Sequence, residues 1–105
     1  VSLIYLGTDI YKSIGINEKI AVKAFKPLLE GTFRNIENRG VTESLTGPIQ
    51  RGDEETIKKH LKAVEKKLPE RLDVYKVMGR LTAEVALKKG LSKEAHDRIV
   101  AILGS

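Results

Sequence analysis

The sequence predicts an all-α fold, a helical bundle of about five to six helices, from three observations. Hydrophobic residues recur at spacings of three and four along most of the chain, which is the period of an α-helix. No stretch alternates polar and apolar residues as a half-buried strand does. Glycine and proline stand between the periodic stretches, where they end and begin helices. At 105 residues there is room for one core, so we expect a single helical domain over residues 1–105.

The N-terminal part predicts two helices, over residues 2–14 and from about residue 18 to Arg39. The apolar face of the first helix is predicted to hold Leu3, Leu6, Ile10 and Ile14. Asn17 is a predicted cap of the second helix. The second helix has a predicted inward ridge of Ile20, Ala24, Leu28, Thr32 and Ile36, with Ala21, Phe25, Leu29 and Phe33 beside it. Pro27 lacks an N–H donor inside this helix, so we expect a kink or a break there.

The longest interruption of the helical pattern covers residues 45–53, and the sequence is organised around it. Gly47 and Gly52 allow unusual backbone angles, and Pro48 fixes its own φ. Asp53 is a predicted cap of the next helix. The polar residues of this stretch are Thr46, Gln50 and Arg51. A rigid bent loop of this kind can present such groups to a ligand, and the alternative is a plain connector between helices.

Three further helices are predicted after this loop, over residues 53–67, 70–89 and from the cap Ser92 through Leu103. The buried stripe of the first holds Ile57, Leu61, Val64 and Leu68, and the last turns Ala95, Ile99, Ile102 and Leu103 inward. The helix at 70–89 carries one ridge of Val74, Val77 or Met78, Leu81 and Val85, and a second of Tyr75, Gly79, Thr82 and Ala86. Such a helix suits the middle of a bundle or a subunit interface.

Composition excludes several classes of site. Without cysteine there is no disulfide framework or thiolate metal site. No apolar run approaches a membrane span and no signal peptide is visible, so we expect a cytoplasmic protein that binds no membrane. The net charge of +5 comes from lysine and glutamate interspersed along the chain, a balance that thermophilic proteins favour. A nucleic-acid site is not expected, because glutamates interrupt the lysines at 58–67 and no aromatics lie among them.

Catalytic motifs are few. The sequence has no G-x-G-x-x-G turn and no Walker sequence. His60 and His96 lack metal-ligand neighbours at helical spacing, so we predict no metal site.

Several short motifs lie along the chain at intervals that suggest a known family. They are Pro27-Leu28-Leu29-x-Gly31-Thr32 with Asn35, Leu45-Thr46-Gly47-Pro48-Ile49-x-Arg51-Gly52-Asp53, Thr56, His60-Leu61, Tyr75, and Ala86-Leu87-x-x-Gly90. From about residue 13 to 90 the chain thereby resembles the C-terminal domain of Rossmann-like oxidoreductases that carry a domain of unknown function designated 2520.

This resemblance implies a helical domain like the C-terminal domains of 6-phosphogluconate dehydrogenase, ketopantoate reductase and pyrroline-5-carboxylate reductase relatives. It implies an N-terminal dinucleotide-binding domain before Val1 that binds NADP or NAD, and a homodimer formed through the helical domain. The apolar start at Val1 also suggests a longer chain. This chain alone is then expected to bind no cofactor and to catalyse nothing. The catalytic lysine helix of the hydroxyacid dehydrogenases is not recognisable here.

On this interpretation the residues of the cofactor and substrate cleft are Thr46, Gly47, Pro48, Arg51 and Asn35, with His60 and Thr46 as candidate catalytic residues. Thr46 would donate a hydrogen bond, Arg51 would hold a carboxylate, and His60 would donate a proton. Each also has an ordinary structural role: Thr46 bonding a loop carbonyl, Arg51 at the surface, His60 at the edge of its stripe. The alternative function is a stand-alone helical dimerisation or binding module, with its interface at Gly79, Thr82 and Ala86.

Overall fold

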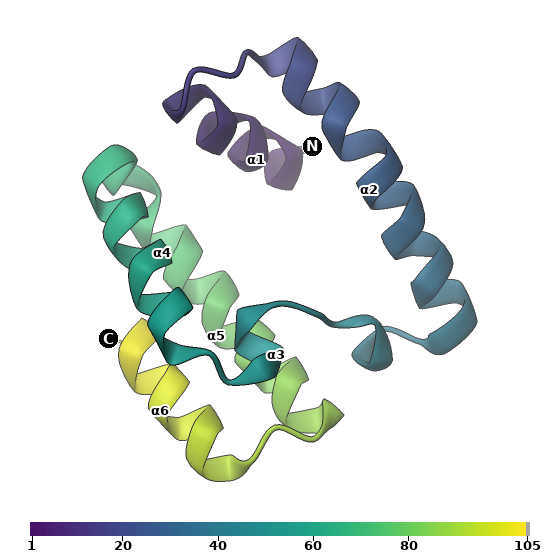
Figure 1. The fold of residues 1–105 in the computed structure, drawn as a ribbon, viewed down its shortest axis with the longest axis vertical. Helices are drawn as coiled ribbons and strands as arrows, with labels where there is room; N and C mark the ends of the chain where they lie inside the picture. The colour runs from purple at the N-terminus through teal and green to yellow at the C-terminus, as the bar shows by residue number, and fades with distance from the viewer. Residues whose placement is uncertain (105) are drawn as a thin grey trace. The chain divides into compact units, whose positions relative to one another are not determined.

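The computed structural model describes residues 1–104, which hold six α-helices and no strand, so the all-α prediction is confirmed. The helices are α1 (Ser2–Ser13), α2 (Glu18–Arg39), α3 (Pro48–Arg51), α4 (Glu54–Lys67), α5 (Leu72–Lys89) and α6 (Lys93–Leu103) (Figure 1). Two single-turn 3₁₀ helices, η1 (Thr42–Ser44) and η2 (Pro69–Arg71), precede α3 and α5.

The chain divides into two compact units at the junction of Arg39 and Gly40. The first unit, here called the N-terminal hairpin, consists of α1 and α2. The second, here called the C-terminal bundle, consists of α3 to α6 with the two 3₁₀ turns. A single domain over the whole chain stays a prediction.

The two helices of the N-terminal hairpin approach most closely at Gly7. A Cβ atom at Gly7 would lie 2.6 Å from Cζ of Phe25, so only glycine admits this ring. The ring of Tyr11 meets the same phenylalanine edge to face, with centroids 5.3 Å apart. Ala21 is fully buried, and so is Thr8, whose hydroxyl donates to the Tyr5 carbonyl over 2.7 Å. The close packing of α1 against α2 therefore depends on Gly7, the smallest residue of α1.

The predicted apolar face of α1 is wrong. Leu3, Ile10 and Ile14 are 64%, 41% and 58% exposed, while the buried residue of this helix is Thr8. Helix α1 is apolar on two adjoining sides, and the side that contains Gly7 allows the closer packing. The leucine and isoleucine side is left at the surface.

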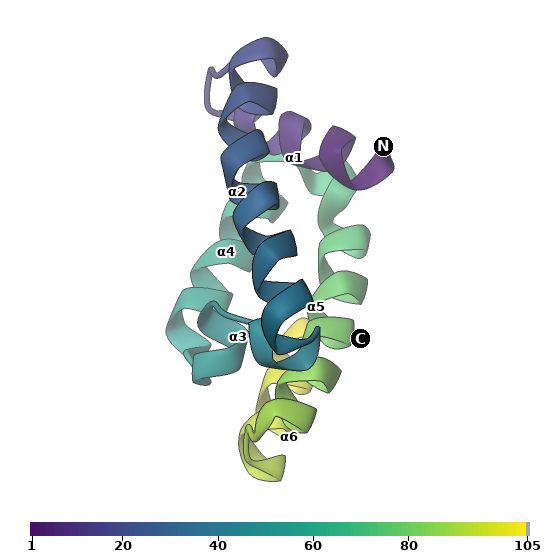
Figure 2. The ribbon, with the colours of Figure 1, turned by 90° about the vertical axis from the view of Figure 1, so that its right-hand side faces the viewer.

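Helix α2 is continuous through Pro27, so of the expected kink or break the break is wrong and the kink stays a prediction (Figure 2). Proline removes one backbone hydrogen bond, but its own φ is that of a helix. The predicted cap is confirmed, because Asn17 Oδ1 accepts a hydrogen bond from the Ile20 amide over 3.0 Å. The predicted inward ridge is wrong, since Ile20 and Leu28 are 57% and 64% exposed and only Ala21 is buried.

The C-terminal bundle has a core of Ile57, Ala83, Ile99 and Leu103, all at most 1% exposed. The predicted stripe of α4 supplies Ile57 to this core, with Leu61 packed against it. The predicted inward residues Ile99 and Leu103 come from α6. Helices α4 and α6 thus meet where their hydrophobic periods predict, whereas Ala83 of α5 was on neither predicted ridge.

Helix α5 packs its small residues against α6. A Cβ atom at Gly79 would lie 2.9 Å from Cδ1 of Leu103, and Ala83 and Ala86 are fully buried. The prediction that this ridge forms a subunit interface is therefore wrong, because its central residues are covered within the bundle. The other ridge of α5 reaches the surface, with Val74, Val77, Met78 and Leu81 at least 38% exposed.

Candidate functional site

The stretch at residues 45–53 is a compact turn and contains one turn of helix, α3, which the sequence did not predict. Gly47 precedes α3 with φ +102°, and Gly52 ends it in the left-handed region with φ +69°. Pro48 occupies the first helical position, where its missing N–H is not needed. The amides of Arg51 and Asp53 donate to the carbonyls of Gly47 and Pro48 over 3.1 and 2.9 Å. The turn is therefore held by its own backbone.

Contacts with α4 and α5 fix both ends of this turn. At the first end, Lys89 Nζ donates to the Leu45 carbonyl over 2.8 Å. At the second end, the Asp53 carboxylate accepts from the Thr56 amide over 3.2 Å and from the Thr56 hydroxyl over 2.7 Å. The predicted cap of α4 is thus confirmed. Between them, Ile49 packs against the core of the bundle.

The charge of Asp53 belongs to this cap. The Thr56 hydroxyl, then the Thr56 amide, and to a smaller extent the Arg51 guanidinium lower the pKa of Asp53 below its ordinary value. The guanidinium lies 3.8 Å from the carboxylate. Asp53 is therefore ionised at neutral pH and engaged as an acceptor, which suits a structural role better than a catalytic one.

The structure brings four of the predicted cleft residues together. Gly47 and Pro48 form the half-buried base of the turn, while Thr46 and Arg51 are exposed beside them. His60 lies on α4, exposed, one helical turn beyond Thr56. Asn35 lies on α2, in the N-terminal hairpin, and is exposed. The turn itself therefore carries two of the exposed candidate residues, Thr46 and Arg51.

Two residues of this region were not assigned a role from sequence. Gln50 Oε1 is buried and accepts no hydrogen bond from residues 1–104, so it is an unsatisfied hydrogen-bond acceptor. Lys89, which anchors Leu45, is separated from it by 44 residues. The loop position of Gln50 was visible in the sequence, but no local pattern indicates the contact of Lys89.

The described residues 1–104 hold no group of three or more histidine, aspartate or glutamate side chains that could bind a metal ion. In the same range, no helix has the length and apolar character needed to cross a bilayer.

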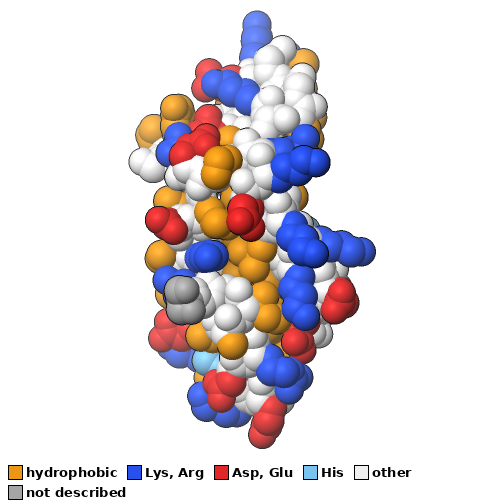
Figure 3. Space-filling model, turned by 90° about the vertical axis from the view of Figure 1, so that its left-hand side faces the viewer, with side chains coloured by type: hydrophobic (Ala, Val, Ile, Leu, Met, Phe, Trp, Pro, Cys, Tyr) orange, Lys and Arg blue, Asp and Glu red, His pale blue; other side chains and the backbone are white. Residues whose placement is uncertain are grey.

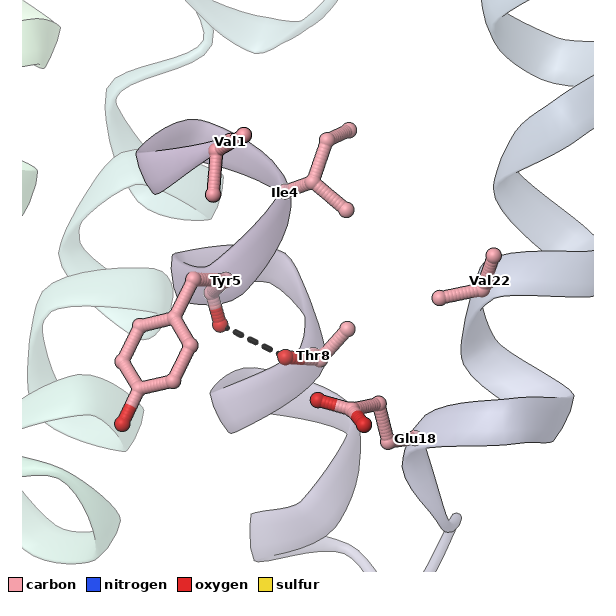
Figure 4. A pocket seen from close by; sticks show the side chains of 6 residues that line it. All are labelled: Val1, Ile4, Tyr5, Thr8, Glu18 and Val22. Atoms are coloured by element: carbon pink, nitrogen blue, oxygen red, sulfur yellow. Dashed lines mark hydrogen bonds between the residues drawn. The ribbon is translucent and has the colours of Figure 1, made fainter.

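The N-terminal hairpin contains two open apolar cavities between α1 and α2. One, of about 350 Å³, is lined by Val1, Ile4, Tyr5, Thr8, Glu18 and Val22 (Figure 4). The second, of about 340 Å³, is lined by Ile4, Val22, Phe25, Lys26, Leu29 and Glu30. Figure 4 shows the Thr8 hydroxyl already bonded to the Tyr5 carbonyl. A small-molecule site needs convergent polar groups, and the walls of these cavities are mainly hydrocarbon.

Comparison with curated proteins and with solved structures finds no match for this chain. A family model does match, over residues 1–82, which includes both helices of the hairpin, the turn at 45–53 and α4. This match covers most of the chain and confirms the domain of unknown function designated 2520 that the sequence motifs suggested. The chain belongs to the family described as domain of unknown function DUF2520.

Proposed function

We propose that this chain is the substrate-side and dimerisation domain of an NAD(P)-dependent oxidoreductase. A separate dinucleotide-binding domain of the protein would hold NADP or NAD, which supplies the hydride, and the helical domain would position the substrate. The observation that carries the proposal is the turn at residues 45–53. It is fixed at both ends by hydrogen bonds, yet it leaves Thr46 and Arg51 exposed.

Each exposed group of the turn has a role that suits a small polar substrate. Arg51 offers a fork of N–H donors that matches a carboxylate, and its side chain is 62% exposed. Thr46 offers a hydroxyl to the substrate or to the nicotinamide amide. His60, on α4, would serve as the proton donor.

Cofactor titration of the natural full-length protein tests this proposal. We expect NADPH or NADH to bind with a measurable heat in calorimetry, and the isolated 105-residue chain to bind neither. A full-length protein that binds neither cofactor would overturn the oxidoreductase assignment.

Turnover of carboxylate-bearing carbonyl and imine compounds then tests the site residues. We expect Arg51→Ala to raise KM strongly and His60→Gln to lower kcat by about 10²-fold. Lys59→Gln, a neighbour of His60 that is also exposed, is the matched control and should leave both constants unchanged. Unchanged kinetics in the His60 and Arg51 variants would show that the substrate site is not at this turn.

A second function, a helical dimerisation or binding module without enzymatic activity, is favoured by the apolar side chains that α2 and α5 leave exposed. Figure 3 shows hydrophobic side chains at the surface among charged ones. Self-association of the full-length protein without binding of either cofactor would support this alternative.

A further inference from the structure

Helix α2 is too long for α1 to cover. At the rise of an α-helix, the 22 residues of α2 extend about 33 Å and the 12 residues of α1 about 18 Å. Three apolar residues share one side of α2 at spacings of seven and four, and we call them the α2 stripe: Val22, Leu29 and Phe33. They are 47%, 49% and 63% exposed. Nothing in the hairpin covers the far end of this stripe.

The second cavity of the hairpin lies along the same stripe, because Val22 and Leu29 line it together with Phe25 and Ile4. Its remaining walls are Lys26 and Glu30. An apolar floor with charged residues along one edge is suited to the side chains of another helix.

Along this edge of α2, positive and negative residues occupy different halves of the helix. Four charged residues lie within about 40° of one another around the axis, at 3.6 residues per turn: Lys19, Lys26, Glu30 and Glu37. The lysines stand toward the N-terminus of α2 and the glutamates toward its C-terminus. None of the four forms an ion pair within residues 1–104.

The four charges of α2 are complementary to those of a second copy of the helix when the two helices are antiparallel. Lys26 and Glu30 are each two residues from position 28, and Lys19 and Glu37 are each nine residues from it. An antiparallel copy of α2 centred on position 28 therefore places lysine opposite glutamate at all four positions. In the same register, Val22 of one copy lies within one residue of Phe33 of the other. In a parallel pair about a two-fold axis, the charged edges of the two copies would lie on opposite sides of the interface and would not face each other.

We infer that the α2 stripe is the interface with a second copy of this chain, with the two α2 helices antiparallel about a two-fold axis. In such an interface each contact occurs twice. The apolar residues of the stripe supply the buried area, and the charged edge sets orientation and register. This inference rests on the dimerisation in the proposed function and assigns the helix that performs it.

Charge reversal in the full-length protein tests the register. We expect Lys26→Glu and Glu30→Lys each to weaken self-association about tenfold at low salt, since each turns two attractive contacts into repulsive ones. Mixing the two variants should restore association as a heterodimer. The first variant carries an acidic side chain at both positions and the second a basic one at both, so opposite charges face each other again. Native mass spectrometry of the two species, distinguished by an affinity tag, measures this heterodimer.

A change in the internal stability of α2 would not produce the heterodimer, so the mixture isolates the contact between copies. Asn38→Lys, at an exposed position on the side of α2 away from the stripe, is the control and should leave association unchanged. Phe33→Glu should abolish it. A mixture without heterodimer, or a Phe33→Glu protein that remains dimeric, would overturn the α2 interface.

The two proposals can fail separately. If the wild-type protein is dimeric and binds cofactor, but none of the α2 substitutions weakens the dimer, the α2 interface alone is refuted. A wild-type protein that is monomeric at every concentration in sedimentation would refute dimerisation itself, while the cofactor titration still decides the oxidoreductase assignment.

Discussion

The N-terminal hairpin and the C-terminal bundle differ in how each obtains its stability. The bundle buries Ile57, Ile99 and Leu103 in one cluster. The hairpin fully buries only Ala21 and Thr8. Of the large hydrophobic side chains that remain exposed, ten lie in the hairpin and five in the bundle, although the hairpin is the shorter unit.

This difference indicates that the hairpin is not built to stand alone. Units below about 40 residues rarely bury enough apolar surface to fold without help from a disulfide, a metal or association. The hairpin has 39 residues, and the chain has no cysteine. We therefore regard its exposed residues as an unfinished core and those of the bundle as surface.

The largest expected effect comes from opening a cavity in the core of the bundle. Leu103→Ala should lower the free energy of unfolding by about 2–5 kcal/mol, because Leu103 is fully buried against α5. Leu3→Ala, at a 64% exposed leucine of the hairpin, should change it by less than about 0.5 kcal/mol. Urea denaturation of both variants checks the contrast, and equal losses would contradict it.

Substitutions at two helical glycines compare a tightly packed position in the bundle with an open position in the hairpin. Gly79→Leu should destabilise the protein by about 1–3 kcal/mol or more, since a Cβ atom there already lies 2.9 Å from Leu103. Gly31→Ala on α2 should stabilise it by about 0.5–1 kcal/mol, because the added Cβ would meet only the Arg34 guanidinium, 3.9 Å away. Thermal unfolding measures both. A neutral Gly79→Leu would show that α5 and α6 are placed wrongly.

The caps of the two units should differ in their response to pH. The pKa of Asp53 is lower in the folded state than in the unfolded state, so its contribution is present above the unfolded pKa and is lost as pH falls through the folded one. The stability difference between wild type and Asp53→Ala should therefore shrink in acid. Asn17→Ala removes the neutral cap of α2, and its effect should stay constant. Denaturation from neutral to acid pH measures both, and a constant effect at Asp53 would contradict the lowered pKa.

The smallest expected effect concerns the ion pair that links α6 to α4. Arg98 Nε donates to Glu54 Oε2 over 2.9 Å, with the two side chains 57% and 29% exposed. A double-mutant cycle of Arg98→Gln and Glu54→Gln should give a coupling of about 0.2–1 kcal/mol that declines with added salt. A coupling that is independent of salt would indicate a contribution other than charge.

Local signals predicted the helix boundaries well, because caps depend on neighbours in sequence. Asp53 and Ser92 cap α4 and α6 as expected, and Gly40 follows α2 with a positive φ. Helix α3 was missed because a proline between two glycines also suits an irregular loop. The contact of Lys89 with Leu45 depends on how α5 packs, which no local pattern encodes.

The sequence predicted which side of a helix is buried where the helix has one apolar side. It did not where the helix has more than one. Ile57 of α4 lies inward as its period predicts, whereas Leu3 of α1 and Leu28 of α2 lie outward. In the candidate site, Thr46 and Arg51 were predicted together because they flank one short turn. His60 and Asn35 lie on other helices, and a sequence without pairwise contacts does not indicate their distance from the turn.

The unbroken course of α2 through Pro27 has a consequence for how this helix forms. A proline in the interior of a helix costs about 3 kcal/mol, which a solvated helix cannot recover from its own backbone. The residues of α2 beyond Glu30 lie past the reach of α1, so their helical state depends on whatever covers the far end of the α2 stripe. Ordering of this segment is then coupled to association, and the far-ultraviolet circular dichroism of the protein becomes a function of its concentration.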